Sequence, residues 1–141
     1  MAPAATPHSP VGTIWRDGPA AFAFLTELGF SGPERIAGGL RYQRGQLQID
    51  IDFWAWKNEC GFDTTLRWID QPASGVQLDR WYVDLGLGPA QDVPTDGGNG
   101  SVHLIRKRLE QHAEALRRVL PRLPPDTDGV AGTRNIAPTG T

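Results

Sequence analysis

The residues best suited to chemistry are two aspartates, Asp50 and Asp52, in the segment QLQIDIDFWAW. Two residues apart on a β-strand, their carboxylates lie on one face at a distance of about 7 Å. That spacing suits a metal ion or a glycosidase acid–base pair, and Asp63 could supply a third ligand. We favour the more ordinary interpretation, a solvated strand face on which Asp50 pairs with Arg67 of a neighbouring strand.

Two tryptophans, Trp54 and Trp56, continue the same face of this strand. Indole is a poor partner for water, and aromatic side chains are common in the centre of protein interfaces. The sequence leaves two possibilities open, because another element could cover both rings or they could form part of a binding surface. With its expected cross-strand neighbours, the candidate binding face consists of Arg41, Asp50, Asp52, Trp54, Trp56, Asp63 and Arg67.

The remaining reactive side chains form no recognisable constellation. His103 and His112 lie on different faces of one expected helix, and His112 interrupts an apolar stripe, which is more typical of a satisfied or boundary residue than of a catalyst. The single cysteine, Cys60, excludes an intrachain disulfide and has no neighbouring base. The glycine-rich stretch 96–100 precedes a helix but lacks the ending of a phosphate-binding loop. We therefore predict no catalytic residues, metal ligands or cofactor.

Composition indicates a globular chain with an uneven charge distribution. Of its 141 residues, 39% are hydrophobic, and no apolar run approaches the ~20 residues of a membrane helix. The first ten residues lack the features of a secretory signal, so we expect a cytoplasmic location. Residues 46–100 carry three cations against nine carboxylates, whereas residues 101–122 carry six cations against two carboxylates. These regions could neutralise each other within the fold, or the acidic one could attract a basic partner; a pI near 5.9 argues against nucleic acid.

The element that must position the candidate face is a β-hairpin over Leu40–Trp56, in which apolar and polar residues alternate. We place its two-residue turn at Arg44-Gly45, which sets Tyr42 opposite Leu47. A third strand is expected at Phe62–Ile69. The predicted pairs between the second and third strands are Ile51 with Leu66, Asp50 with Arg67, Asp52 with Thr65, and Trp54 with Asp63.

Two helices are expected to cover one face of these strands. The first has Asp17 as its cap, Pro19 in its first turn and Gly29 just past its end. The second runs from about Val102 to Leu120, with Ser101 as its cap and an apolar stripe along its length.

Three other segments are less clearly patterned. Residues 11–15 fit a short strand or a lead-in, and residues 31–39 are rich in turn formers. Residues 78–85 fit a short additional helix, although the wider stretch 76–87 also fits a strand. We predict a single α+β domain over residues 11–122, in which a three-stranded antiparallel meander is covered on one face by the N- and C-terminal helices. Residues 1–10 are expected to be a disordered arm and residues 123–141 a loose tail.

The order of helix, meander and helices, with the phrases FLTELGF and QLQIDIDF, resembles small bacterial α+β proteins, including immunity-type proteins encoded beside toxins. The resemblance covers about Phe22 to Leu120, and it transfers no functional residue. We expect a non-enzymatic protein-binding domain, in its specific form a toxin-neutralising immunity protein whose acidic, tryptophan-bearing face meets a basic protein. The alternatives are a small-ligand or metal-binding enzyme that uses the sheet-face aspartates, and a structural subunit of a larger bacterial or phage assembly, such as a homo-oligomer.

Overall fold

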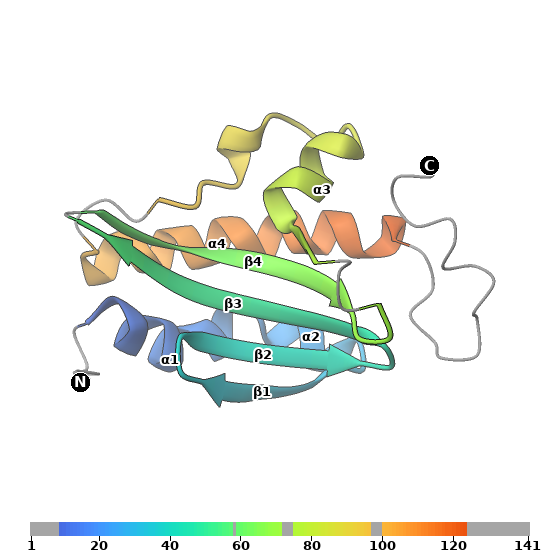
Figure 1. Ribbon diagram of the computed structural model, residues 1–141, viewed down its shortest axis with the longest axis horizontal. Helices are drawn as coiled ribbons and strands as arrows, with labels where there is room; N and C mark the ends of the chain where they lie inside the picture. The colour runs from blue at the N-terminus through green and yellow to red at the C-terminus, as the bar shows by residue number, and fades with distance from the viewer. Residues whose placement is uncertain (1–8, 58, 72–74, 97–99, 124–141) are drawn as a thin grey trace.

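The computed structural model describes residues 9–57, 59–71, 75–96 and 100–123, which form an α+β fold. Five strands form one antiparallel sheet in sequence order: β1 Ser31–Ile36, β2 Gly39–Arg44, β3 Leu47–Trp56, β4 Glu59–Trp68 and β5 Val76–Gln77. The α-helices are α1 Pro10–Ala21, α2 Ala23–Glu27, α3 Leu78–Asp84 and α4 Val102–Val119. Figure 1 shows the sheet in front of α1, α2 and α4, so these three helices cover one face, as predicted for the first and last helices.

The core lies between this sheet face and the helices. Alternate residues of the central strands point into it, and the apolar stripe of α4 meets them there. The fully buried members include Ile14, Leu40, Ile49, Ile51, Leu66, Ile105, Leu109 and Leu116. The inner face predicted from the alternation of apolar and polar residues is therefore confirmed.

The predicted three-stranded meander is the centre of a larger sheet, so the expected strand number was wrong. β1 occupies the segment expected to be a turn-rich link, and it pairs with β2 with a register shift between Ser31 and Glu34. Its Gly32-Pro33 pair looks like a turn in the sequence, but proline is tolerated in an edge strand because no neighbour needs its missing N–H. The other added strand, β5, is only two residues long.

The observed register of β2 with β3, and that of β3 with β4, each differ from the predicted register by two residues. Tyr42 lies opposite Ile49 instead of Leu47, and the turn moves to Gly45-Gln46, where Gly45 has a φ of 58°. Leu66 likewise lies opposite Ile49 instead of Ile51. A two-residue shift keeps every side chain on its own face, so the hydrophobic alternation cannot distinguish the two registers.

The first helix begins earlier than predicted. Ser9, not Asp17, is its cap, and its hydroxyl oxygen accepts a hydrogen bond from the N–H three residues later at 3.0 Å. Residues 11–15 are consequently helical, and Pro19 lies inside α1 instead of at its start. Gly29 follows α2 with a φ of 95°, as expected for a residue that ends a helix.

The later helices agree with the predictions. Ser101 caps α4 by accepting a hydrogen bond from the Leu104 N–H at 3.2 Å. The short helix expected at 78–85 is α3, which confirms the helical alternative for this segment, and the two-residue strand β5 precedes it. Of the expected arm, Ser9 and Pro10 belong to the start of α1, whereas residues 1–8, like residues 124–141 of the expected tail, lie outside the described residues. Among those described, none of the helices has the length and apolar character needed to cross a membrane.

Candidate functional site

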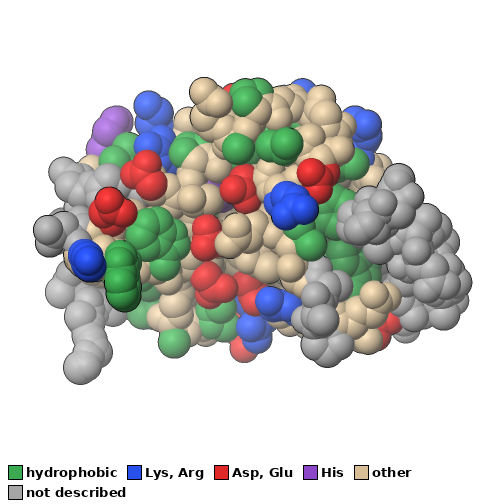
Figure 2. Space-filling model, turned by 45° about the horizontal axis from the view of Figure 1, so that its top comes forward, with side chains coloured by type: hydrophobic (Ala, Val, Ile, Leu, Met, Phe, Trp, Pro, Cys, Tyr) green, Lys and Arg blue, Asp and Glu red, His purple; other side chains and the backbone are tan. Residues whose placement is uncertain are grey.

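The face of the sheet that points away from α1 and α4, here called the open face, carries all seven residues of the predicted binding surface. β2, β3 and β4 contribute them, and the observed pairing keeps them on one side. In Figure 2 acidic side chains gather across the middle of the view, with hydrophobic side chains to their left. The open face contains three environments, around Asp50, around Asp52 and around the tryptophans.

Asp50 is buried and surrounded by donors. Arg41, which lies directly opposite it, donates from Nε to Oδ1 at 2.8 Å and from Nη2 to Oδ2 at 3.2 Å. Gln48 donates to Oδ2 at 3.2 Å, and Arg67 lies 3.5 Å from the same oxygen. The hydrogen bond to Asp50 raises the pKa of Arg41 above its usual value. Both oxygens of Asp50 therefore already have cationic partners, which disfavours a metal or glycosidase pair made with Asp52.

The register shift corrects the predicted neighbours of Asp50. Thr65, not Arg67, lies directly opposite it, and Arg67 lies opposite Gln48. The proposed Asp50–Arg67 ion pair nevertheless exists, because the long arginine side chain reaches diagonally across the sheet.

Asp52 lies directly opposite Asp63, where the predicted register had placed Thr65. Burial, and next the Asp50 carboxylate, raise the pKa of Asp52, while Arg41 and Arg67 lower it by smaller amounts. Burial also raises the pKa of Asp63, with smaller contributions from Asp79 and Asp52. In the described part of the chain, neither Asp52 nor Asp63 forms an ion pair. Like charges placed directly opposite each other destabilise a sheet, so the Asp52–Asp63 pair, here called the acidic row, is electrostatically unfavourable when both carboxyl groups are ionised.

Asp79 is a member of this acidic group that the sequence reasoning missed. It lies in the first turn of α3, directly after the short strand β5 that pairs with β4. A carboxylate in the first turn is a common helix-stabilising feature, so its sequence position suggested only a helix start. Its influence on Asp63 could be recognised only after β5 had been placed beside β4.

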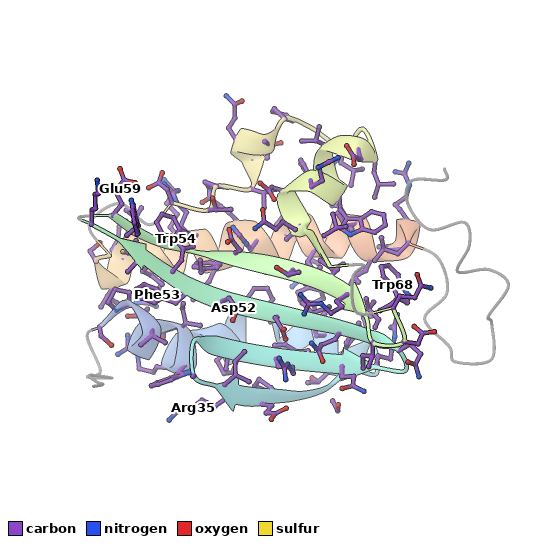
Figure 3. The ribbon with its side chains drawn as sticks, viewed as in Figure 1. Arg35, Asp52, Phe53, Trp54, Glu59 and Trp68 are labelled. Carbon is purple, nitrogen blue, oxygen red and sulfur yellow. The ribbon has the colours of Figure 1, made fainter. Side chains whose placement is uncertain are left out.

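The two tryptophans differ in exposure. Trp56 is 68% exposed near the end of β3, opposite Glu59, and the Lys57 ammonium lies 5.8 Å from its ring centroid. Trp54 is half-buried and lies opposite Gly61, not opposite Asp63 as predicted. Figure 3 shows Asp52 midway along β3, with Trp54 and Glu59 towards the end of the β3–β4 hairpin. Trp56 is thus an uncovered aromatic side chain in line with the acidic row.

On the inner face, His112 is fully buried and hydrogen-bonded at both ring nitrogens. Its Nε2 lies 2.7 Å from the Pro94 carbonyl oxygen, and its Nδ1 lies 2.9 Å from the Thr64 hydroxyl. Because a carbonyl can only accept, Nε2 carries the hydrogen and Nδ1 accepts from Thr64. Burial lowers the pKa of His112 to about 4. Of the two predicted roles, a satisfied or a boundary residue, His112 has the first.

The other candidate groups do not assemble into a reactive site. Cys60 lies in β4, and burial raises the pKa of its thiol, which disfavours the nucleophilic thiolate. Among the described residues, no three histidine, cysteine or acidic side chains are grouped so that they could hold a metal ion. Most of the glycine-rich stretch 96–100, residues 97–99, lies outside them.

Comparison with known proteins finds no matching family model, no matching curated protein and no matching solved structure.

Proposed function

We propose that the chain is a non-enzymatic protein-binding domain whose open face docks a basic partner. The observation that carries the proposal is the Asp52–Asp63 pair, two carboxylates directly opposite each other that have no ion-pair partner among the described residues. Such a pair opposes folding when ionised, whereas a cationic surface placed over it would turn the repulsion into attraction. The facing carboxylates therefore lower the stability of the isolated chain and would strengthen its binding to a basic partner.

Trp56 supports the proposal independently. An aromatic ring that is 68% exposed gains little from water, and tryptophan is enriched among the residues that dominate binding energy. It lies four residues from Asp52 on the same strand face, about 13 Å away, within the breadth of a single protein interface. The acidic row would attract the partner, and Trp56 would supply apolar contact area.

The specific role that we propose is toxin neutralisation by an immunity-type protein. The support for it is the resemblance of the layout to such proteins, together with an acidic face suited to blocking a basic surface. A binding protein of this kind needs no catalytic set, only a rigid face, and five paired strands provide one.

A capture experiment with two matched variants tests the proposal. Immobilised wild-type chain, Trp56→Ala and Leu28→Ala are incubated with extract from the source cells, and captured proteins are identified by mass spectrometry. Leu28 is the control because its side chain is 47% exposed but lies beyond α2, away from the open face. We expect a basic protein that is retained by wild type and Leu28→Ala and lost by Trp56→Ala. Equal capture by all three would contradict the proposal.

A second candidate, a small-ligand or metal-binding enzyme, is favoured by one observation. Asp52 and Asp63 lie opposite each other on neighbouring strands, and burial raises the pKa of both carboxyl groups, which is a common property of catalytic carboxyl groups. A thermal-shift screen of divalent metals and sugars discriminates between the candidates. A reproducible shift that Asp52→Asn abolishes would favour the enzyme, and the absence of any shift would favour the binding domain.

A further inference from the structure

We propose that residues 93–96, here called the strap, form a pH-sensitive cover over the edge of β4, which His112 holds closed and which opens in acid. The strap lies in the connection between α3 and α4. This inference goes beyond the proposed function, because it concerns an edge of the sheet and uses none of the seven residues of the predicted binding surface.

The strap follows the free edge of β4, on the same side as the short strand β5 (Figure 1). The Phe62 N–H donates to the Thr95 carbonyl at 3.0 Å, and Gly61 pairs with Asp96 in an isolated bridge. Within the strap only Val93 is fully buried. The strap can therefore leave β4 without breaking a helix or the pairing of the five strands, which makes its opening a local event that requires less free energy than global unfolding.

Two side chains of α4 hold the strap in place. The Arg108 Nε donates to the Asp96 carbonyl at 2.8 Å, and the His112 Nε2 donates to the Pro94 carbonyl at 2.7 Å. The other ring nitrogen of His112 accepts from Thr64 on the inner face of β4. Because Pro94 is only half-buried, the strap is the layer that separates the buried ring from solvent.

The surroundings of His112 disfavour a charge on its ring while the strap is closed. β4 presents two uncharged side chains, Thr64 and Phe62, whose ring centroid lies 4.6 Å from that of His112. Arg108 on α4 disfavours protonation, whereas Asp79 on α3 and the Pro94 carbonyl favour it. Burial outweighs these contributions and lowers the pKa to about 4. When the strap opens, water reaches the ring and the pKa returns towards about 6.5.

The sign of the pH dependence follows from these two pKa values. Between about pH 6.5 and pH 4 the open state binds a proton that the closed state does not, so the closed state loses stability as the pH falls. The equilibrium constant for opening therefore rises by up to about tenfold for each pH unit in this window. Opening removes the partner of the Phe62 N–H and leaves a strand edge on which another strand can pair.

Amide hydrogen exchange of the full chain, followed by NMR between pH 4 and 7.5, tests the inference. The reporter is the Phe62 amide, which bonds to the strap, and the reference is the Ile69 amide, which donates to the Gln46 carbonyl at 2.7 Å at the opposite end of β4. After correction for intrinsic exchange, we expect protection of Phe62 to fall by about tenfold per pH unit below pH 6.5, with little dependence on urea, and protection of Ile69 to change much less.

Three variants separate the histidine from the other contacts of the strap. His112→Gln should remove the pH dependence at Phe62, whereas His103→Gln should retain it because His103 is exposed. Arg108→Gln loses the bond to Asp96 and should lower protection of Phe62 by about fivefold at every pH, with the pH slope unchanged. This variant, together with wild type, still decides the question if His112→Gln does not fold.

Three results would overturn the inference. The first is protection of Phe62 that does not change with pH, and the second is an unchanged pH slope in His112→Gln. The third is an equal loss of protection at Phe62 and Ile69 with a strong dependence on urea, which would mean that acid unfolds the whole domain instead of opening the strap.

Discussion

Asp50 and Asp52 are the same residue type on the same strand face, two residues apart, yet their surroundings are opposite. Asp50 is 4% exposed and is held by two arginines and a glutamine. Asp52 is half-buried and faces a third carboxylate, Asp63. The fold compensates Asp50 with ion pairs, whereas Asp52 has no ion-pair partner among the described residues. We therefore expect Asp50 to stabilise the sheet and the facing carboxylates to destabilise it when they are ionised.

The same contrast occurs on the inner face. His112 has a hydrogen-bond partner at each ring nitrogen, whereas the Tyr42 hydroxyl, also buried, has none among the described residues. Unlike Asp52, Tyr42 is closed off from any partner protein, so its uncompensated group is simply unfavourable. Exposure therefore determines whether an unsatisfied polar group can serve binding.

The largest effect on stability is expected for His112, which, like Asp50, has partners for its polar atoms. Its pKa is lowered to about 4 in the folded chain, against about 6.5 in the unfolded chain. Its contribution to stability is thus complete above about pH 6.5 and decreases as the pH falls towards 4, by on the order of 3 kcal/mol in all. Urea unfolding at several pH values measures this loss.

The histidine contribution is isolated by comparing two glutamine variants. His112→Gln should lose the additional acid sensitivity, whereas His103→Gln should keep it because His103 is exposed on α4. If His112→Gln depends on pH as steeply as wild type, His112 is not the group responsible.

Removing the compensated carboxylate should have the next largest effect. Asp50→Asn leaves Arg41 and Arg67 close together without their shared counter-ion, and we expect the free energy of unfolding to fall by about 2 kcal/mol. The value is below that for a fully buried pair because both arginine side chains are about one third exposed. Chemical denaturation provides the measurement, and Asp84→Asn, which breaks an exposed pair, should change it by less than about 0.5 kcal/mol. Equal effects of the two variants would show that the Asp50 ion pairs stabilise the fold no more than an exposed pair does.

Two tyrosine-to-phenylalanine variants compare a buried hydroxyl that has no partner among the described residues with one that is hydrogen-bonded. Tyr42→Phe removes a buried hydroxyl without a partner in the described structure and should raise the unfolding free energy by about 1 kcal/mol. Tyr82→Phe should lower it by a similar amount, because the Tyr82 hydroxyl donates to Asp92 at 3.0 Å and accepts from Arg118 at 2.7 Å. Thermal unfolding of both variants beside wild type is the test, and two changes of the same sign would contradict it.

The sequence was sufficient to predict which residues share the open face but not which of them are neighbours. Period-two alternation assigns each side chain to a face, and a two-residue register shift leaves that assignment intact. Whether Asp52 faces Thr65 or Asp63 depends on the turn between β3 and β4, where Trp56 lies opposite Glu59 and Lys57 has a φ of 56°, and the alternation does not encode this turn. β1 was missed for a related reason, since Gly32 and Pro33 are turn formers in sequence but are tolerated at a sheet edge.

The smallest effect is expected for the facing carboxylates, whose removal should change the stability in the opposite direction to the removal of Asp50. At pH 7.5 Asp63→Asn should raise the unfolding free energy by about 0.5 kcal/mol, the opposite sign to Asp50→Asn, because it removes a like-charge pair. The pKa of Asp63 is raised by folding, so the unfavourable contribution is absent below the unfolded pKa near 3.9 and develops as the pH rises through the folded pKa. The stabilisation should therefore disappear in acid.

A double variant shows whether the pair acts as a unit. The repulsion between Asp52 and Asp63 can be removed only once, so Asp52→Asn with Asp63→Asn should stabilise the chain by less than the sum of the single changes. Denaturant unfolding of the four proteins at pH 7.5 completes this cycle. Additive effects, or destabilisation by Asp63→Asn at this pH, would mean that the facing carboxylates do not repel each other and that the contrast with Asp50 is one of exposure alone.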